Sequence, residues 1–192
     1  MELFELLKKT RSYRRFHQDI SIEPEVLSSL IRNTRYCPSA ANLQPLRYML
    51  VTNRDMNSRI FEQLRWAAYL KDWNGPVAGE RPSAYIIILG KPKANSFLQW
   101  DTGIALQTLM LSLTEIGFGG CPFGAFNREA LEEILDLPDE FRIELVLAIG
   151  KPKEQVVVID AIDDRIKYYR DEKQVHHVPK RQLSDLILRV IR

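Results

Sequence analysis

Six residues near the two ends of the chain carry groups that suit a phosphate. They are Arg11, Ser12, Arg14 and Arg15, which fall within five positions, and Lys180 and Arg181. Guanidinium forks and a hydroxyl match the arrangement of phosphate oxygens. Charged clusters of this kind also occur as plain solvated surface. Two interpretations therefore stay open: the two clusters converge on one phosphate, or both are surface charge.

The segment PSAANLQP, residues 38–45, has an unusual composition for a connection. Three small residues, Ser39, Ala40 and Ala41, precede two side-chain amides, Asn42 and Gln44. The segment is too small to fill a core, and it carries more hydrogen-bonding groups than a plain linker needs. A role in contacting a ligand is one explanation.

The cysteines and histidines indicate neither a nucleophile nor a metal site. Cys121, in GGCPFG, has no histidine, arginine or lysine beside it in sequence to lower its thiol pKa, which favours a small hydrophobe in a tight turn. The chain has neither C-x-x-C nor H-x-x-x-H spacing, so we expect no zinc. It also has neither G-x-G-x-x-G nor G-x-x-x-x-G-K-[ST], which argues against a Rossmann or P-loop nucleotide site.

Four other polar residues leave alternatives open. Asp101 and Gln107 interrupt an apolar helical pattern, where they either reach a ligand or serve as a cap and an interhelical hydrogen bond. Tyr168 and Tyr169 either stack on a ring or pack under a loop.

The elements that must position these residues follow from periodicity and turn signals. We expect helices at 2–9, 24–36, 54–70, 97–116 and 127–136, strands at 46–52, 84–89 and 143–149, and a surface loop at 72–82. GFGG provides a glycine-rich stop for the helix 97–116, Asn127 caps the next helix, and the chain from residue 153 has mixed character. Helices interleaved with strands predict an α/β or α+β architecture around one sheet.

Length, composition and charge exclude several classes of protein. A chain of 192 residues fits one domain, residues 1–192. Its 45% hydrophobic and 27% charged residues are ordinary for a globular protein, and a net charge of +2 gives no field for nucleic acid or an anionic membrane. The longest apolar stretch, 104–113, is too short to span a bilayer. With two cysteines and no signal-type N-terminus, we expect a cytoplasmic protein.

The helix expected at 97–116 also predicts an oligomer. Its apolar residues point in nearly every direction around its axis, so all of its sides need cover. One small sheet with a few helices covers only part of it, and a second copy of the chain is the economical cover. The apolar terminus LSDLILRVI, residues 183–191, is a further candidate for wrapping a neighbour. We therefore predict a homodimer.

Taken together, the motifs resemble those of the nitroreductase family of FMN-dependent flavoproteins, over nearly the whole chain. The resemblance rests on the order and spacing of RSYRRF, PSAANLQPLRYMLV, DTGIALQTLMLSLTEIGFGG, CPFGAF, IGKP and VPKR. It implies an α+β nitroreductase-like fold, with a central mixed sheet flanked by helices, and an intertwined homodimer that binds FMN at its interface.

The resemblance also implies roles for particular residues. Phosphate contacts fall to Ser12, Lys180 and Arg181, and Arg14 is the residue that reaches the flavin N1/O2 edge. Many members begin the first motif with two arginines, whereas Thr10 stands first here, so the missing contact passes to Arg11 or to the C-terminal pair. The loop that lies along the flavin of the partner subunit corresponds to Pro38, Ser39, Ala40 and Asn42. The turn that lies against the flavin ring corresponds to Phe123 and Gly124. Cys121 is then a neighbour of the flavin.

The implied activity is an FMN-dependent NAD(P)H oxidoreductase with ping-pong hydride transfer to an electron-poor acceptor such as a nitroaromatic or a quinone. In such a protein the cofactor carries the chemistry, which explains why no catalytic acid or nucleophile stands out. Two alternatives stay open. One is another flavin reaction on the same scaffold, dehydrogenation or reductive dehalogenation. The other is a flavin-binding sensor or store without turnover.

Overall fold

The computed structural model describes residues 2–91 and 97–192. Their contacts divide the chain into two compact units, Met1–Arg65 with Gly75–Lys153, and Trp66–Asn74 with Glu154–Arg192. The single domain predicted from length stays a prediction.

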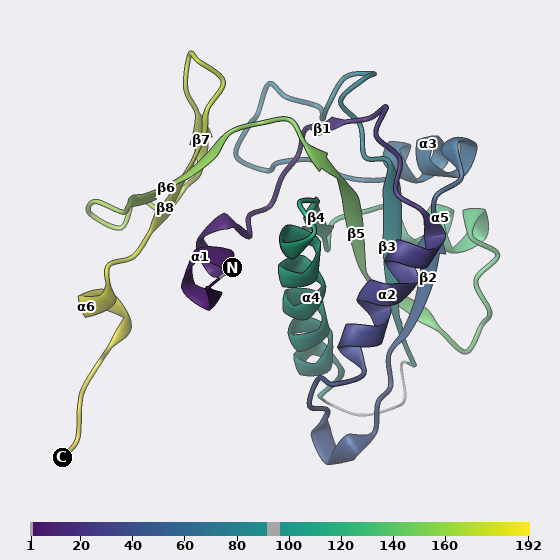
Figure 1. The fold of residues 1–192 in the computed structure, drawn as a ribbon, viewed down its shortest axis with the longest axis horizontal. Helices are drawn as coiled ribbons and strands as arrows, with labels where there is room; N and C mark the ends of the chain where they lie inside the picture. Colours follow the sequence, from purple (N-terminus) through teal and green to yellow (C-terminus); the bar gives the residue numbers. More distant parts are fainter. Residues whose placement is uncertain (1, 92–96) are drawn as a thin grey trace. The chain divides into compact units, whose positions relative to one another are not determined.

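The larger unit holds most of the regular structure (Figure 1). Its elements are α1 (Leu3–Lys9), β1 (Phe16–His17), α2 (Pro24–Thr34), the short helix η1 (Ala40–Asn42), β2 (Arg47–Val51), α3 (Arg54–Glu62), β3 (Ala84–Gly90), α4 (Leu98–Glu115), β4 (Gly119–Phe123), α5 (Arg128–Ile134) and β5 (Arg142–Pro152). The smaller unit holds β6 (Val156–Asp160), β7 (Tyr169–Arg170), β8 (His176–Lys180) and α6 (Leu183–Leu186).

The sheet of the larger unit has the order β1-β5-β3-β2, with β4 also paired to β5. All four pairings between these strands are antiparallel, so the central mixed sheet that we predicted is wrong. The error has a physical reason. A continuous apolar run such as AYIIIL shows that a strand is buried on both faces, which is typical of parallel sheets, but it does not encode the direction of the neighbouring strand. The mixed sheet is the small one, where β6 and β8 are parallel and β7 and β8 antiparallel.

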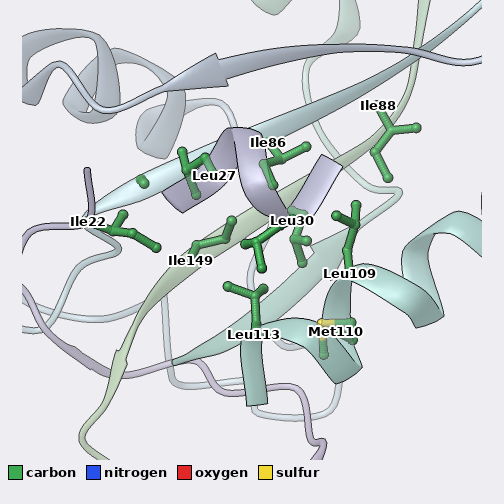
Figure 2. Close-up of a cluster of buried hydrophobic side chains, with 11 residues drawn as sticks. Ile22, Leu27, Leu30, Ile86, Ile88, Leu109, Met110, Leu113 and Ile149 are labelled. Atoms are coloured by element: carbon green, nitrogen blue, oxygen red, sulfur yellow. The ribbon is translucent and has the colours of Figure 1, made fainter. Parts of the chain in front are cut away.

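The core lies between this sheet and the pair α2 and α4, which contact each other (Figure 2). Alternate residues of β3, including Ile86 and Ile88, face Leu30 of α2 and Leu109 and Leu113 of α4. The side chains that alternate with them on β3 are also fully buried. Burial of apolar area on both faces makes β3 part of the core of the larger unit.

Local signals set the helix boundaries as the sequence indicates. Pro24 opens α2, and Asn53 and Asn127 cap α3 and α5 by accepting hydrogen bonds from Met56 N and Ala130 N. Gly117 follows α4 with φ of +75°, a conformation that favours glycine. The expected helices at 2–9, 24–36, 97–116 and 127–136 are therefore confirmed within a residue or two.

The helix expected over 54–70 is wrong in its second half, because α3 ends at Glu62. The backbone beyond it pairs with the segment before α5: Arg65 N donates to Ala125 O, and Asn127 N donates to Gln63 O. These tertiary hydrogen bonds replace the helical ones, and local periodicity does not report such competition.

A strand occupies the glycine-rich stretch after α4, where we expected only turns. Gly119–Phe123 forms β4, and Cys121 is a buried strand residue opposite Ala148. Cys121 is the small hydrophobe we predicted, but the tight turn is wrong. A Cβ on Gly119 would lie 2.5 Å from Tyr13 Cδ2, and one on Gly120 would lie 2.8 Å from Leu147 Cδ1. These glycines permit close packing and do not end the helix.

One side of α4 is covered and the other is exposed. Asp101, Ala105 and Leu109 are buried, while Trp100 is 66% exposed and Ile104 38%. The apolar surface all round the helix that we expected is present, and this chain covers only part of it. Among residues 2–91 and 97–192, no helix is both long and apolar enough to span a membrane.

The smaller unit has its own buried contacts. Arg170 of β7 forms an ion pair with Glu154 at 3.1 Å, and both side chains are nearly inaccessible. Tyr168 lies 5.0 Å from Tyr69 and 5.1 Å from His176, measured between ring centroids, so it packs in a small aromatic cluster. The packing role that we left open for Tyr168 is confirmed. The apolar residues of 183–191, among them Leu186, Leu188 and Ile191, are exposed.

Candidate flavin-binding site

The loop 38–45 is tied to α4 by one buried carboxylate. Asp101, 5% exposed, accepts a hydrogen bond from Ser39 Oγ at 2.8 Å and another from Ala40 N at 3.3 Å. Ser39 Oγ in turn accepts from Gln44 N at 2.9 Å. Asp101 is therefore not the first-turn cap that we considered, and its bond to Ala40 joins α4 to the short helix η1. It fixes the loop to the helix.

The backbone of this loop is strained. Ala41, Asn42 and Gln44 have φ values of 48°, 55° and 47°, in the left-handed region that costs a residue with a side chain about 1 kcal/mol or more. Gln44 Nε2 donates to the carbonyl and the side-chain oxygen of Asn42, which closes the turn. Strain that persists under a network of hydrogen bonds is typical of a segment shaped for binding.

A pocket of about 170 Å³ lies under the loop. Its lining includes Cys37, Pro38, Ser39, Tyr48 and Asp101. Burial raises the pKa of the Tyr48 hydroxyl, so this group stays protonated at neutral pH and is able to donate a hydrogen bond.

The first basic motif is joined to β4. Ser12 forms a parallel bridge with Gly120, and Tyr13 N donates to Gly120 O at 3.0 Å. Phe123 is the last residue of β4, and Gly124 follows it. The structure therefore brings Ser12 and the segment 119–124 together. The turn that we expected at Phe123 is strand, its side chain is buried, and Gly124 is the first residue outside it.

Thr10 and Arg11, the first two residues of the basic motif, differ in their surroundings. Thr10 is buried, and its hydroxyl donates to Leu6 O at 2.7 Å and contacts Thr114 Oγ1 of α4 at 3.0 Å. It is a packing residue. Arg11 Nη2 donates to Leu7 O at 2.8 Å, whereas its Nε is buried and has no hydrogen-bond partner within residues 2–91 and 97–192. Burial lowers the pKa of Arg11, because the charged guanidinium loses part of its hydration.

The remaining arginines of the motif differ in role. Arg14 Nη1 donates to Ser12 O at 3.3 Å, so it stays beside Ser12. Arg15 pairs with Glu80 through two hydrogen bonds of 2.5 and 2.8 Å, and Lys153 reaches the same carboxylate at 3.1 Å. Arg15 thus belongs to an ion cluster. Glu80 is buried, although we placed it in a surface loop, because these two cations compensate its charge.

The C-terminal basic pair belongs to the smaller unit. Lys180 ends β8, where it lies opposite Asp160, and Arg181 pairs with Asp164. Convergence of this pair with Ser12 on one phosphate stays a prediction.

Within the larger unit, the loop and the basic motif lie at opposite ends of α4 (Figure 1). The loop contacts Asp101 near the start of the helix, and Thr10 contacts Thr114 near its end. At roughly 1.5 Å per residue these two anchors are about 20 Å apart along the helix. The loop and the basic motif are therefore well separated within one chain.

Sequence reasoning missed two contributors. For Asp101 we considered a ligand contact, a cap or an interhelical hydrogen bond, but we did not predict that its partner is the loop 38–45. Tyr48 stood inside an apolar strand pattern and carried no signal of its own.

Comparison with known proteins identifies the family to which the chain belongs. The family model described as "Nitroreductase family" matches residues 7–151. An iodotyrosine deiodinase of Thermotoga neapolitana is 25% identical, over 91% of this chain and 97% of that protein. An Archaeoglobus fulgidus protein, provisionally named NADH dehydrogenase/NAD(P)H nitroreductase, is 27% identical over 81% of this chain and 88% of that protein.

Solved structures share the fold. A nitroreductase family protein from Clostridium novyi superposes with a TM-score of 0.68 and 23% identity, covering 93% of this chain and 94% of that one. An FMN-dependent nitroreductase from Clostridium difficile gives 0.65 and 20%, covering 84% and 92%. The α+β nitroreductase-like fold that we predicted is thus confirmed.

Proposed function

Because this chain belongs to the nitroreductase family, we propose that it is an FMN-dependent NAD(P)H oxidoreductase that reduces an electron-poor acceptor such as a nitroaromatic or a quinone. The observation that carries the proposal is the arrangement on α4, which we interpret as two half-sites of a flavin site: a strained loop held by Asp101 at one end, and a basic motif whose Arg11 Nε lacks a hydrogen-bond partner among the described residues at the other.

The residues present fit FMN. Arg11 Nε is a buried donor without a partner among the described residues. A bound anion such as a phosphate would supply the missing acceptor. At Gly124 an added Cβ would meet its nearest atom only at 3.8 Å, so this position leaves room beside the backbone for a flat ring. In the loop, the small side chains of Ser39 and Ala40 allow a similarly close approach.

When bound, FMN supplies two-electron chemistry, with hydride taken from NAD(P)H in one half-reaction and delivered to the acceptor in the next. The residues of the chain orient it and set its charge environment. Arg14 would place positive charge at the N1/O2 edge, which favours the reduced state electrostatically. Ser12 and Arg11, with Lys180 and Arg181, would hold the phosphate, and Ser39, Ala40 and Asn42 would lie along the ring system.

We further propose that the two half-sites are completed in a homodimer. If two α4 helices pack antiparallel across a two-fold axis, the loop end of one helix comes beside the basic-motif end of the other. The exposed apolar side of α4, with Trp100 and Ile104, suits such a contact. Leu3, Phe4 and Leu7 of α1 are exposed as well, and so is the segment 183–191. This much exposed apolar surface supports a large interface.

A single preparation tests both proposals. The purified protein should be yellow with flavin absorbance bands, NADH or NADPH should bleach them within seconds, and light scattering should give twice the chain mass. Ile104→Glu places a charge on the exposed side of α4, so it should dissociate the dimer and release FMN together. Lys71→Glu, on an exposed turn of the smaller unit, is the control. A stable Ile104→Glu monomer that binds FMN as tightly as the wild type would refute the composite site.

Reductive dehalogenation is a second candidate, because the deiodinase relative covers as much of the chain as any nitroreductase relative that we compared. The two candidates share FMN and differ in acceptor. Iodide release from 3-iodotyrosine, driven by reduced FMN, would support dehalogenation. NAD(P)H oxidation dependent on a nitroaromatic or a quinone, with no iodide release, would support the first proposal. Absence of turnover with all three acceptors would favour a flavin sensor or store.

A further inference from the structure

A second pocket lies at the other end of β2 from the loop 38–45. Its volume is about 450 Å³, within the range of small-molecule sites. Its lining includes Thr52, Asn57, Phe61, Arg81, Ser83 and Tyr85. Among the described residues, none lines both this pocket and the one beneath the loop. We refer to it as the α3 pocket.

Polar atoms without partners gather at this pocket. Asn57 Oδ1, Arg81 Nε, Ser83 Oγ and the Tyr85 hydroxyl are all buried and have no hydrogen-bond partner in the described part of the chain. Asn57 is 7% exposed and Tyr85 is fully buried. Buried polar groups are nearly always paired, because an unpaired one loses its hydration without replacement. Four of them occur in the lining of one pocket, so their partners must come from outside the described residues, either from water or from a bound molecule.

The side chains are held in place by other contacts. Asn57 Nδ2 donates to Ser83 O at 2.8 Å, which leaves its Oδ1 as the free acceptor. The Arg81 guanidinium lies 4.3 Å from the centre of the Phe61 ring. Gln18 Oε1 accepts from Gly79 N at 2.7 Å and from Arg81 N at 3.3 Å, which fixes the backbone at the rim. Asn57 and Arg81 therefore keep their positions, as a site formed in advance requires.

Donors and acceptors in the pocket define the chemistry of a ligand. The guanidinium of Arg81 and the hydroxyl of Tyr85 donate, and burial raises the pKa of Tyr85, so its proton is retained. Asn57 Oδ1 accepts. Arg54 and Arg81 are balanced by Asp19 and Asp55 in the lining, so the pocket carries no excess of either charge. A bare anion would leave the Asn57 Oδ1 acceptor without a donor.

We propose that the α3 pocket binds a small organic acid that carries a hydroxyl or amino group beside its carboxylate. The carboxylate takes the Arg81 guanidinium and the Tyr85 hydroxyl, and the hydroxyl or amino hydrogen faces Asn57 Oδ1. Ser83 Oγ donates or accepts as the ligand requires. The site is separate from the proposed flavin site and does not depend on it.

Three probes with one carbon skeleton test this proposal. Lactate and L-alanine carry the donor group, and propionate lacks it. Calorimetric titration of the full chain should show that lactate or L-alanine binds at least tenfold more tightly than propionate. Tyr85→Phe removes only the hydroxyl and should weaken that binding about tenfold, with the flavin content unchanged. Tyr36→Phe changes an exposed tyrosine outside the pocket and should bind as the wild type does.

Two results would overturn the proposal. One is equal or undetectable binding of all three probes, which would mean that water alone serves the free atoms. The other is unchanged affinity in Tyr85→Phe, with a higher thermal midpoint, because the variant then only loses an unsatisfied hydroxyl. If Tyr85→Phe does not fold, Ser83→Ala is the substitute, because it removes the Ser83 hydroxyl of the same pocket and should also weaken binding.

Discussion

Replacing Asp101 tests whether the loop 38–45 is a binding element or only a connection. Its carboxylate accepts hydrogen bonds from Ser39 Oγ at 2.8 Å and from Ala40 N at 3.3 Å. Asp101→Ala removes both, and the strained backbone at Ala41 and Asn42 is then free to relax. We expect the variant to lose the loop conformation while α4 itself is retained.

The magnitude follows from the two contacts. Hydrogen bonds to a charged acceptor contribute roughly 1.5–3 kcal/mol each, and the longer one to Ala40 falls at the low end. Removing a buried carboxylate also removes its desolvation cost, so the net loss in free energy of unfolding should be only about 1–3 kcal/mol. FMN binding has no such offset, because the ligand must now order the loop. We expect its dissociation constant to rise by roughly 10- to 100-fold.

The assay is a fluorescence titration of FMN with urea unfolding in parallel. Asp101→Asn keeps one oxygen that can accept from Ser39, so its effect should fall between the wild type and Asp101→Ala. Asp139→Ala, an exposed residue after α5, is the matched control and should change neither quantity. A loss of stability in Asp101→Ala with an unchanged FMN dissociation constant would show that the loop does not contact the cofactor.

Three further predictions address the charged residues. The hydrogen bond that Arg15 donates lowers the pKa of Glu80 from 4.5 to about 2. The ionised carboxylate therefore stabilises the folded state fully above pH 4.5, and this stabilisation is lost as the pH falls toward 2. That span corresponds to about 3 kcal/mol, and acid titration of unfolding in Glu80→Gln should lack it. Arg14→Ala should make the flavin potential more negative, and a wild-type potential would remove Arg14 from the mechanism. Alanine at both Lys180 and Arg181 should weaken FMN binding at least tenfold, and an unchanged titration would reject convergence on the phosphate.

The fold was predictable where one local signal dominates. Pro24 and Asn127 begin their helices as expected, and the apolar run 84–89 forms the buried strand β3. Prediction failed where tertiary hydrogen bonds compete with local periodicity, as beyond Glu62, and where glycines allow a strand to pack closely, as in β4. The prediction of strand direction failed for a related reason, because the direction depends on chain connections that apolar patterns do not encode.

The site was predictable only as far as its motifs. Ser12, Arg14 and the loop residues came from the resemblance, and the structure places Ser12 beside β4 and Ser39 on Asp101. The partner of Ser39 is 62 positions away in the chain, and no spacing rule connects them. Glu80 was missed because a carboxylate in a loop rich in glycine and proline is ordinarily solvated, and its cations lie far away in sequence.

The placement of the half-sites has a thermodynamic consequence for the proposed dimer. If FMN contacts the basic motif of one chain and the loop of the other, cofactor binding and dimerisation are linked equilibria, and each strengthens the other by the same factor. Dilution should then release FMN, and added FMN should shift the dimer dissociation curve to lower protein concentration. In Asp101→Ala the loop contributes less, so that shift should shrink even where the dimer survives. A dissociation curve that does not move with FMN would mean that each chain binds its cofactor alone.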